Sequence, residues 1–316
     1  MFPLLLAMHL PDGFLTLPVL LGCWLLAGVA LAWVLRARDL ETAGERLPLI
    51  GVLAAAIFAA QMLNFPIAGG TSGHLLGAAL ATLVLGPGTA MLVMTTVVAV
   101  QALFFQDGGL LALGANLLNM AVIGVWVTYV VHRLLSPTLK RLRWGEQISA
   151  FLAAWASIVF AALACGLELA LSGAAPARLV IPAMGGIHAL IGLVEGAITL
   201  GALAFLHTAR PAIRQPAPLS PVERRGVFLG GLLITLVLII AAPLASTAPD
   251  GLERVAEDLG FITHAAAPLF HLLADYTVPG LGEGALSTIA AGLIGAALVL
   301  AAIWGIIALR ARHAGR

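Results

Sequence analysis

Two histidines in short polar breaks are the residues best suited to bind a metal ion. His9 follows Met8 and precedes a turn and a long apolar stretch. If Met8 is the first residue of the mature chain, its free amine, the amide nitrogen of His9 and the Nδ1 atom of His9 can close two fused chelate rings on one ion. His74 ends a glycine-rich break and can supply a fourth nitrogen. Planar nitrogen donors suit Ni(II), Cu(II) or low-spin cobalt, whereas Mg²⁺ and Ca²⁺ prefer oxygen.

The chelate depends on a free amine at Met8. Residues 1–7 carry no charge and are too short to hold both the charged region and the apolar core of a signal peptide. We therefore expect them to be absent from the mature chain, either because translation starts at Met8 or because the segment is cleaved after Ala7. If the segment stays attached, the nitrogen of Met8 is an amide and the chelate is lost.

Further polar residues lie where they can support these ligands. Asp12 lies in a turn, where it either accepts a hydrogen bond from the chelating end or is solvated. Thr71 and Ser72 precede His74 and are candidates to cap the helix that follows. Asn116 is one of several amides inside apolar segments, where such side chains more often join neighbouring helices than bind ligands.

His188 and Glu195 are seven positions apart in one predicted helix, so they lie on one face. Titratable side chains within the membrane are costly and usually face the protein interior. The pair either supports the metal ligands from the floor of the site or bonds a neighbouring helix. Glu168, near a predicted helix end, is expected to reach water. Cys23 and Cys165 lie in apolar runs without a CxxC spacing and are interpreted as small buried hydrophobes.

The composition defines the environment in which these residues must be held. Hydrophobic residues make up 61% of the 316 residues and charged residues 10%, whereas a soluble domain is about one quarter charged. The chain is therefore a membrane protein. A net charge of +1 and the lack of a basic patch argue against nucleic acid as a partner. The sequence has no GxxxxGK[ST] or HExxH motif, so we predict that the chain is not itself an ATPase or another enzyme.

Nine segments are apolar enough to form transmembrane helices, which need about 20 residues. The third is short and is bounded by glycines, a pattern typical of transporters that hold polar groups at membrane depth. The predicted fold is an all-α polytopic membrane protein with about nine transmembrane helices. These helices are residues 15–35, 48–64, 75–86, 89–105, 111–134, 148–172, 184–206, 226–246 and 285–309.

Positive charges predict the orientation of these helices. If the first loop is cytoplasmic, the cytoplasmic side carries all of the 16 Lys and Arg residues except Arg178 and Arg254. Such an excess is the positive-inside signal. It places the N-terminus, His74 and the loop over 247–284 outside the cell membrane and the C-terminus in the cytoplasm.

The chain is predicted to contain two units. A seven-helix metal-capture unit covers residues 8–206, and a two-helix unit covers 226–309. Residues 207–225 are rich in proline and arginine and are expected to form a cytoplasmic linker. The outer loop of the second unit contains the sequence PDGLE at 249–253.

From residue 8 to about 206 the chain resembles the substrate-capturing M component of cobalt/nickel energy-coupling factor (ECF) transporters. The tail, 220–310, resembles the small N component through its PDGLE sequence, so the two components are fused here. The motifs that carry the first resemblance are MHLPDGF at 8–14, GHLLGAAL at 73–80, LGP at 85–87, VQALF at 100–104, DGG at 107–109 and LGAN at 113–116.

The resemblance implies a square-planar ion bound by the amine of Met8, the amide nitrogen and Nδ1 of His9, and His74. It also implies a membrane-embedded T component and two cytoplasmic ATP-binding subunits as partners, in addition to membrane lipid. The expected function is therefore capture of Co²⁺ or Ni²⁺ outside and release to the cytoplasm. Both ions accept planar nitrogen, although the Irving–Williams order favours nickel in a shared site.

Two other functions fit parts of the sequence. The chain could act alone as a proton-coupled secondary metal transporter that uses His188 and Glu195. It could also be a membrane scaffold that binds no stoichiometric metal. The part played by the C-terminal two-helix unit, in loading, release or stability, stays open at this stage.

Overall fold

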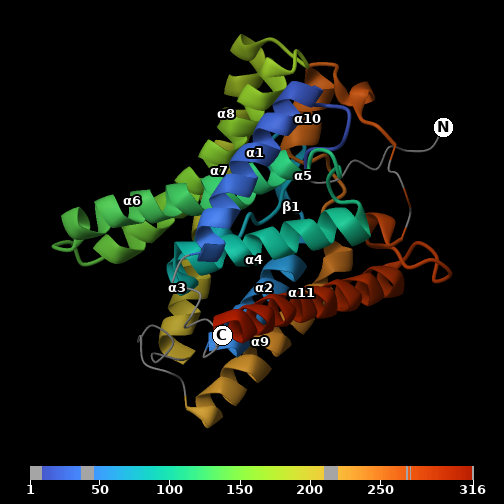
Figure 1. Cartoon of the computed structure of the whole chain (residues 1–316). Helices are drawn as coiled ribbons and strands as arrows, with labels where there is room; N and C mark the ends of the chain where they lie inside the picture. Colours follow the sequence, from blue (N-terminus) through green and yellow to red (C-terminus); the bar gives the residue numbers. More distant parts are fainter. Residues whose placement is uncertain (1–8, 37–45, 210–219, 268–269, 271, 315–316) are drawn as a thin grey trace.

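The computed structural model describes residues 9–36, 46–209, 220–267, 270 and 272–314 (Figure 1). Its helices confirm the predicted all-α polytopic membrane fold. The α-helices are α1 (Leu17–Arg36), α2 (Leu47–Gln61), α3 (Ala78–Leu85), α4 (Pro87–Val100), α5 (Leu113–Asn116), α6 (Gly124–Leu139), α7 (Gly145–Leu171), α8 (Ala177–Ala209), α9 (Pro221–Ala241), α10 (Gly251–Asp258) and α11 (Ala285–Ala314).

Shorter elements complete the fold. Two segments are π-helical: η3 (Gln101–Phe105) continues α4, and η4 (Leu117–Ile123) joins α5 to α6. Three 3₁₀ turns follow in the C-terminal unit, η6 (Ala242–Leu244), η7 (Ile262–His264) and η8 (Ala274–Tyr276). The strands β1 (Phe65–Ile67) and β2 (Thr71–Gly73) pair as an antiparallel hairpin.

Each of the predicted transmembrane segments contains a helix, but two of the helices are short. Seven helical stretches in the described part of the chain are long and apolar enough to cross a membrane. By contrast, α2 has 15 residues and α3 has 8. Helix α3 is short because Gly77 and Gly86, at its two ends, have φ angles of +81° and +83°, a region that favours glycine.

Helix α4 is the centre of the bundle, whereas α1 lies at its edge. Most side chains of α4 are buried. Helix α1 buries only the narrow face that carries Leu20, Cys23, Ala27 and Val34, and it exposes leucines on the other side. Because hydrocarbon is as apolar as leucine, an exposed apolar face is compatible with lipid.

The two long helices of the C-terminal unit pack on the first unit. In Figure 1, α9 and α11 lie beside α2, and α11 also contacts α4. Glycines allow a close approach: a Cβ atom at Gly231 would overlap Val52, and one at Gly295 would overlap Phe58. The short helix α10 lies instead at the opposite side of this unit, against α8 and β2. The C-terminal unit therefore reaches the hairpin that precedes His74.

Candidate metal centre

The segment that carries His9 is folded back into the bundle and held by side-chain amides. Asn116, at the end of α5, binds Leu10 twice: its Oδ1 atom accepts from the backbone N–H at 3.0 Å, and its Nδ2 atom donates to the backbone oxygen at 3.1 Å. The carboxylate of Asp12 accepts from the N–H groups of Leu110 and Ala112 at 3.1 and 2.9 Å. These bonds lock the N-terminal segment against the loop between η3 and α5.

Asp107, in the same loop, holds the imidazole of His9. The Nδ1 atom of His9 donates to Oδ1 of Asp107 at 2.7 Å, and the hydroxyl of Tyr276 donates to the other carboxylate oxygen at 2.6 Å. Burial pushes the pKa of Asp107 upward, but His9 and the two hydrogen bonds outweigh it, so the pKa lies below its usual 3.8. Asp107 is therefore a buried carboxylate.

The other ring nitrogen of His9 has no partner. His9 is 3% exposed, and its Nε2 atom is buried without a hydrogen bond in the described structure. Since a buried polar atom without a partner costs free energy, this nitrogen indicates a place for a ligand. The ring of His74 lies 5.7 Å away between centroids, tilted by 57°.

The loop around His74 is fixed by the buried side chains on both sides of it. The carboxylate of Glu195 accepts from the N–H groups of Leu76 and Gly77 at 2.7 and 3.0 Å. The side chain of Gln61 donates to the oxygen of Leu76 at 2.8 Å. Nδ1 of His74 donates to its neighbour's carbonyl at 3.0 Å, which leaves the lone pair of the neutral ring on Nε2.

His9, His74 and His188 line one cavity of about 80 Å³, which we call the histidine cavity. One water needs about 10–15 Å³, so an ion with a few small ligands fits. His188 donates from Nδ1 to the oxygen of Met184 at 2.8 Å. Among the described residues, no three His, Cys, Asp or Glu side chains converge closely enough to hold a metal ion by themselves. A main-chain donor would have to complete the set, and Met8 lies outside the described residues.

A buried polar pair lies behind this cavity. Nδ2 of Asn119, which lines the cavity, donates to Glu168 at 2.8 Å, and the thiol of Cys23 approaches the other oxygen of Glu168 at 3.5 Å. Asn119 belongs to η4, and π-helical turns are frequent at functional sites. Both cysteines are free and buried, as predicted, and Cys165 lines the cavity as an apolar side chain.

The C-terminal unit covers the cavity from one side. The backbone N–H of Ser72 donates to Pro249 at 2.8 Å, and that of Ala266 donates to Asp12 at 2.7 Å. Leu252, at the start of α10, lines the cavity itself. Leu252 and Val255 of α10 belong to the same buried apolar cluster as Ala115 of α5 and Leu20 of α1. The segment that carries His9 and the hairpin before His74 therefore each make a backbone hydrogen bond to the C-terminal unit.

The part of the C-terminal unit that covers the cavity carries two carboxyl groups with raised pKa values, Asp250 and Glu253. Asp250 caps α10 by accepting from Leu252 and Glu253. Burial nevertheless raises the pKa of Asp250 to about 7. Burial and the nearby Asp250 raise the pKa of Glu253 to about 8. Near neutral pH a large part of these two carboxyl groups is therefore protonated, and a nearby cation would favour their ionised form.

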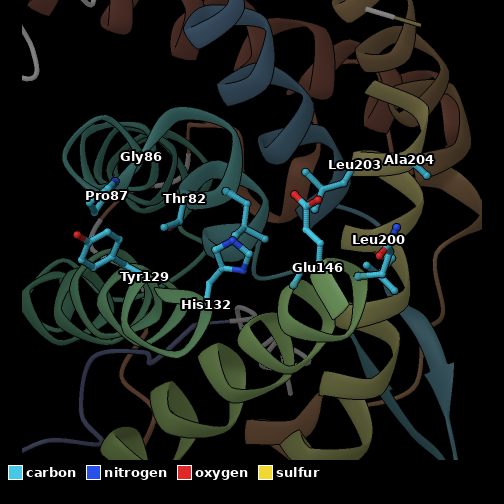
Figure 2. Close-up of a pocket in the computed structure, with 12 residues that line it drawn as sticks. Thr82, Gly86, Pro87, Tyr129, His132, Glu146, Leu200, Leu203 and Ala204 are labelled. Carbon is cyan, nitrogen blue, oxygen red and sulfur yellow. The ribbon is translucent and has the colours of Figure 1, made fainter. Parts of the chain in front are cut away.

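A second, larger cavity of about 360 Å³ is lined by none of His9, His74 and His188 (Figure 2). Tyr129 and His132 of α6 and Glu146 of α7 surround it together with Leu203 of α8. Leu203 is fifteen positions after His188 on α8, or about 22 Å along a helix that rises 1.5 Å per residue. None of the predicted ligands lines this cavity.

Several predicted roles are corrected by the structure. Thr71 and Ser72 do not cap the following helix, because α3 begins only at Ala78 and Glu195 accepts from the N–H groups before it. Both residues lie in β2 instead, and the Ser72 hydroxyl donates to the backbone oxygen of Ala248. Asp12 accepts from the N–H groups of Leu110 and Ala112 and not from the predicted chelating end, and Glu168 is buried rather than in contact with water.

Other predicted residues lie where the sequence suggested a supporting role. Asn116 and His188 line the cavity, whereas Glu195 accepts hydrogen bonds from the backbone after His74. Asp107 and Tyr276, which support His9, were not predicted from the sequence. A lone aspartate in a glycine-rich loop between two apolar segments is a signal that could have identified Asp107. No local signal marks Tyr276.

Comparison with known proteins assigns the chain to a family. Residues 9–213 match the model of the cobalt uptake substrate-specific transmembrane region, CbiM. The chain belongs to the CbiM family. Residues 225–312 match the PDGLE domain, so this CbiM member carries that domain in the same chain. Residues 210–219 of the predicted linker (207–225) lie outside the described residues, whereas 207–209 belong to α8 and 221–225 to α9.

Curated relatives agree with this membership. A putative fused nickel transport protein of Archaeoglobus fulgidus is 39% identical over 93% of this chain and 96% of its own length. A fused nickel transport protein of Rhodobacter capsulatus is 33% identical over 98% of this chain and 100% of its own. A cobalt transport protein CbiM of Sorangium cellulosum is 33% identical over 65% of this chain and 94% of its own.

A solved structure supports the fold. The crystal structure of a truncated transition metal transporter is 32% identical, with a TM-score of 0.53, and the match covers 64% of this chain and 99% of that one. This CbiM-family chain is thus a multi-pass membrane protein of a transition-metal transport family.

Proposed function

We propose that this chain is the substrate-capture subunit of an ATP-driven ECF-type importer of nickel or cobalt. The observation that carries the proposal is the small cavity that the buried His9 lines together with His74, with 5.7 Å between the centroids of the two rings. The ligand set is the amine of Met8, the amide nitrogen and Nδ1 of His9, and His74. Nickel is the expected preferred ion, because the Irving–Williams order favours it and relatives that span both units are named nickel transport proteins.

Chelation through Nδ1 requires a rearrangement of His9. In the described structure Nδ1 donates to Asp107, so the ion must replace this hydrogen bond while the ring proton moves to Nε2. Ligands must be deprotonated to bind, and metal binding therefore releases protons. Affinity for the ion is expected to fall as the pH is lowered.

The remaining parts of the proposal concern direction and partners. The ion enters from the outer side, where the positive-inside pattern puts His9 and His74, and leaves toward the cytoplasm. A T component and two ATP-binding subunits supply the energy, since the chain has no P-loop of its own. The capture unit over 8–206 and the two-helix unit over 226–309 act in one polypeptide.

The proton-coupled alternative finds less support. Glu195 would have to exchange protons with the ion path, but its two oxygens accept from the backbone N–H groups of Leu76 and Gly77. It lines neither the histidine cavity nor the larger one. This geometry favours a fixed role for Glu195 in shaping the His74 loop.

Metal content and the optical spectrum test the capture site. The protein is purified with Met8 as its first residue and is offered Ni²⁺ and Co²⁺ together. We expect one tightly held ion per chain, with the absorption of a planar nitrogen complex that disappears in acid. A protein that retains no ion, or an ion with an octahedral oxygen spectrum, would contradict the proposed ligand set.

Uptake measurements in cells test the coupling. Import of radioactive nickel should require the partner ATPases. Import by this chain alone that an uncoupler abolishes would favour the secondary transporter instead.

A further inference from the structure

A hydrogen-bonded chain connects the C-terminal unit to His9. The carboxylate of Asp107 accepts from His9 at 2.7 Å and from the hydroxyl of Tyr276 at 2.6 Å. The Tyr276 oxygen in turn accepts from Nε2 of Gln101 at 3.2 Å. Of these four side chains, only that of Tyr276 comes from the region that matches the PDGLE domain.

The turn that carries Tyr276 is held tightly in place. Its ring stacks on Phe105, with 4.8 Å between centroids and 21° between planes. The N–H of Leu273 donates to the oxygen of Phe104 at 3.1 Å. Asp275 and Tyr276 have φ angles of +53° and +56°, a region that is strained for residues other than glycine. Such strain persists where surrounding contacts over-determine it, often at functional sites.

We propose that Tyr276 is a positioning residue for the transported ion, which acts through Asp107 on the imidazole of His9. The inference rests on the proposed function and assigns a part in ion capture to one side chain of the C-terminal unit. Tyr276 itself does not line the histidine cavity, so its effect must pass through the carboxylate.

The physical reason lies in what Asp107 loses when the ion binds. Before binding, the buried carboxylate has two donors, His9 and Tyr276. When the ion takes Nδ1 of His9, the donor from His9 is lost. A buried carboxylate without donors is costly, so the remaining bond from Tyr276 lowers the cost of releasing His9. If His9 instead binds through Nε2, the same bond holds Asp107 against Nδ1 and orients the ring. In both arrangements, removal of the hydroxyl weakens binding.

The test compares two Tyr→Phe variants of the full chain with Met8 as its first residue. The probe is Ni²⁺ alone, titrated in competition with a chromogenic chelator. Tyr276→Phe should raise Kd about tenfold, which is in the range for a hydrogen bond to a charged group. The control is Tyr129, the only other tyrosine of the sequence, which lines the larger cavity. Tyr129→Phe should leave Kd unchanged.

A double-mutant cycle separates positioning from general stability. In the Asp107→Asn background, Tyr276→Phe should change Kd less than twofold, because its target charge is gone. An equal loss in both backgrounds, or no loss in either, would overturn the inference. The Ni²⁺ absorption band should shift in Tyr276→Phe but not in Tyr129→Phe.

Two further outcomes are distinguishable. If Tyr276→Phe fails to fold, Gln101→Leu removes the donor behind the Tyr276 oxygen and should raise Kd two- to threefold; an unchanged Kd there counts against the inference. If the unmodified protein binds no Ni²⁺, the proposed function fails and this inference fails with it. If the unmodified protein binds Ni²⁺ and Tyr276→Phe binds it equally well, only the role of Tyr276 is refuted.

Discussion

The two cavities of this protein differ in a way that size does not predict. The larger, about 360 Å³, is lined mainly by side chains of α6, α7 and α8, including His132 and Glu146. The smaller, about 80 Å³, collects three histidines from separate elements and contains an unpartnered imidazole nitrogen. The residues around the smaller cavity also make hydrogen bonds to the C-terminal unit: Ser72 donates to Pro249, and Asp107 accepts from Tyr276. Its unsatisfied polar atom and its converging supports, rather than its volume, make the smaller cavity the candidate for the metal site.

Substitution of one histidine in each cavity is expected to give the largest difference in the Kd for Ni²⁺. His74→Ala should raise the Kd for Ni²⁺ by more than about 100-fold, because even residues behind a metal ligand are typically worth 10–100-fold. His132→Ala, in the larger cavity, should leave Kd unchanged. Equilibrium dialysis of the purified variants measures both values, and membrane insertion should be normal for both. Equal losses would mean that the larger cavity also takes part in binding.

Blocking the N-terminal amine tests the donor that lies outside the described residues. A fusion placed before Met8 and left uncleaved turns the amine into an amide and should weaken Ni²⁺ binding by about 100-fold, the scale by which a tethered second donor raises affinity. Cleavage that restores Met8 as the first residue should recover it. The same fusion at the C-terminus is the control. Tight binding by the blocked protein would exclude the terminal chelate.

A glycine in the Asp107 loop tests how closely this loop must approach the segment that carries His9. A Cβ atom at Gly109 would overlap the carboxylate and backbone of Asp12. Gly109→Ala should therefore destabilise the fold by about 1–3 kcal/mol, as overpacking does, and weaken ion binding. Gly28→Ala, with open space around the site of the added Cβ, should not destabilise. Thermal unfolding in detergent and the Kd for Ni²⁺ report the two effects, and a harmless Gly109→Ala would show that the N-terminal segment shifts freely.

The smallest effect is expected at Glu195, which shapes the His74 loop without lining a cavity. Glu195→Gln keeps one acceptor oxygen but replaces the other with a donor that faces a backbone N–H. We expect a loss of about 1–2 kcal/mol in stability and a modest rise in Kd. Exposed Glu283→Gln is the matched control. Loss of transport with unchanged binding and stability would instead revive a proton-transfer role for Glu195.

The sequence predicted the elements of this fold better than their ends. All nine apolar segments contain helices, because burial from water and the length of the hydrocarbon core act on every stretch of such composition. The third segment was predicted to start at residue 75, but the helix begins only at Ala78, and Glu195 satisfies the N–H groups of Leu76 and Gly77 before it. A partner 118 positions away in sequence has no local signature, so Thr71 and Ser72 were wrongly preferred as caps.

The sequence by itself determined that the protein lies in a membrane, that it has no P-loop of its own, and that His9 and His74 are candidate ligands. These conclusions depend on composition and on short motifs, which are local properties. Only the tertiary structure decided that Asp107 holds His9, that Asn119 pairs with Glu168, and that the C-terminal unit contributes Tyr276. These contacts join side chains 49 to 169 positions apart. They exist because a buried polar group must find its partner wherever packing brings one within hydrogen-bond distance.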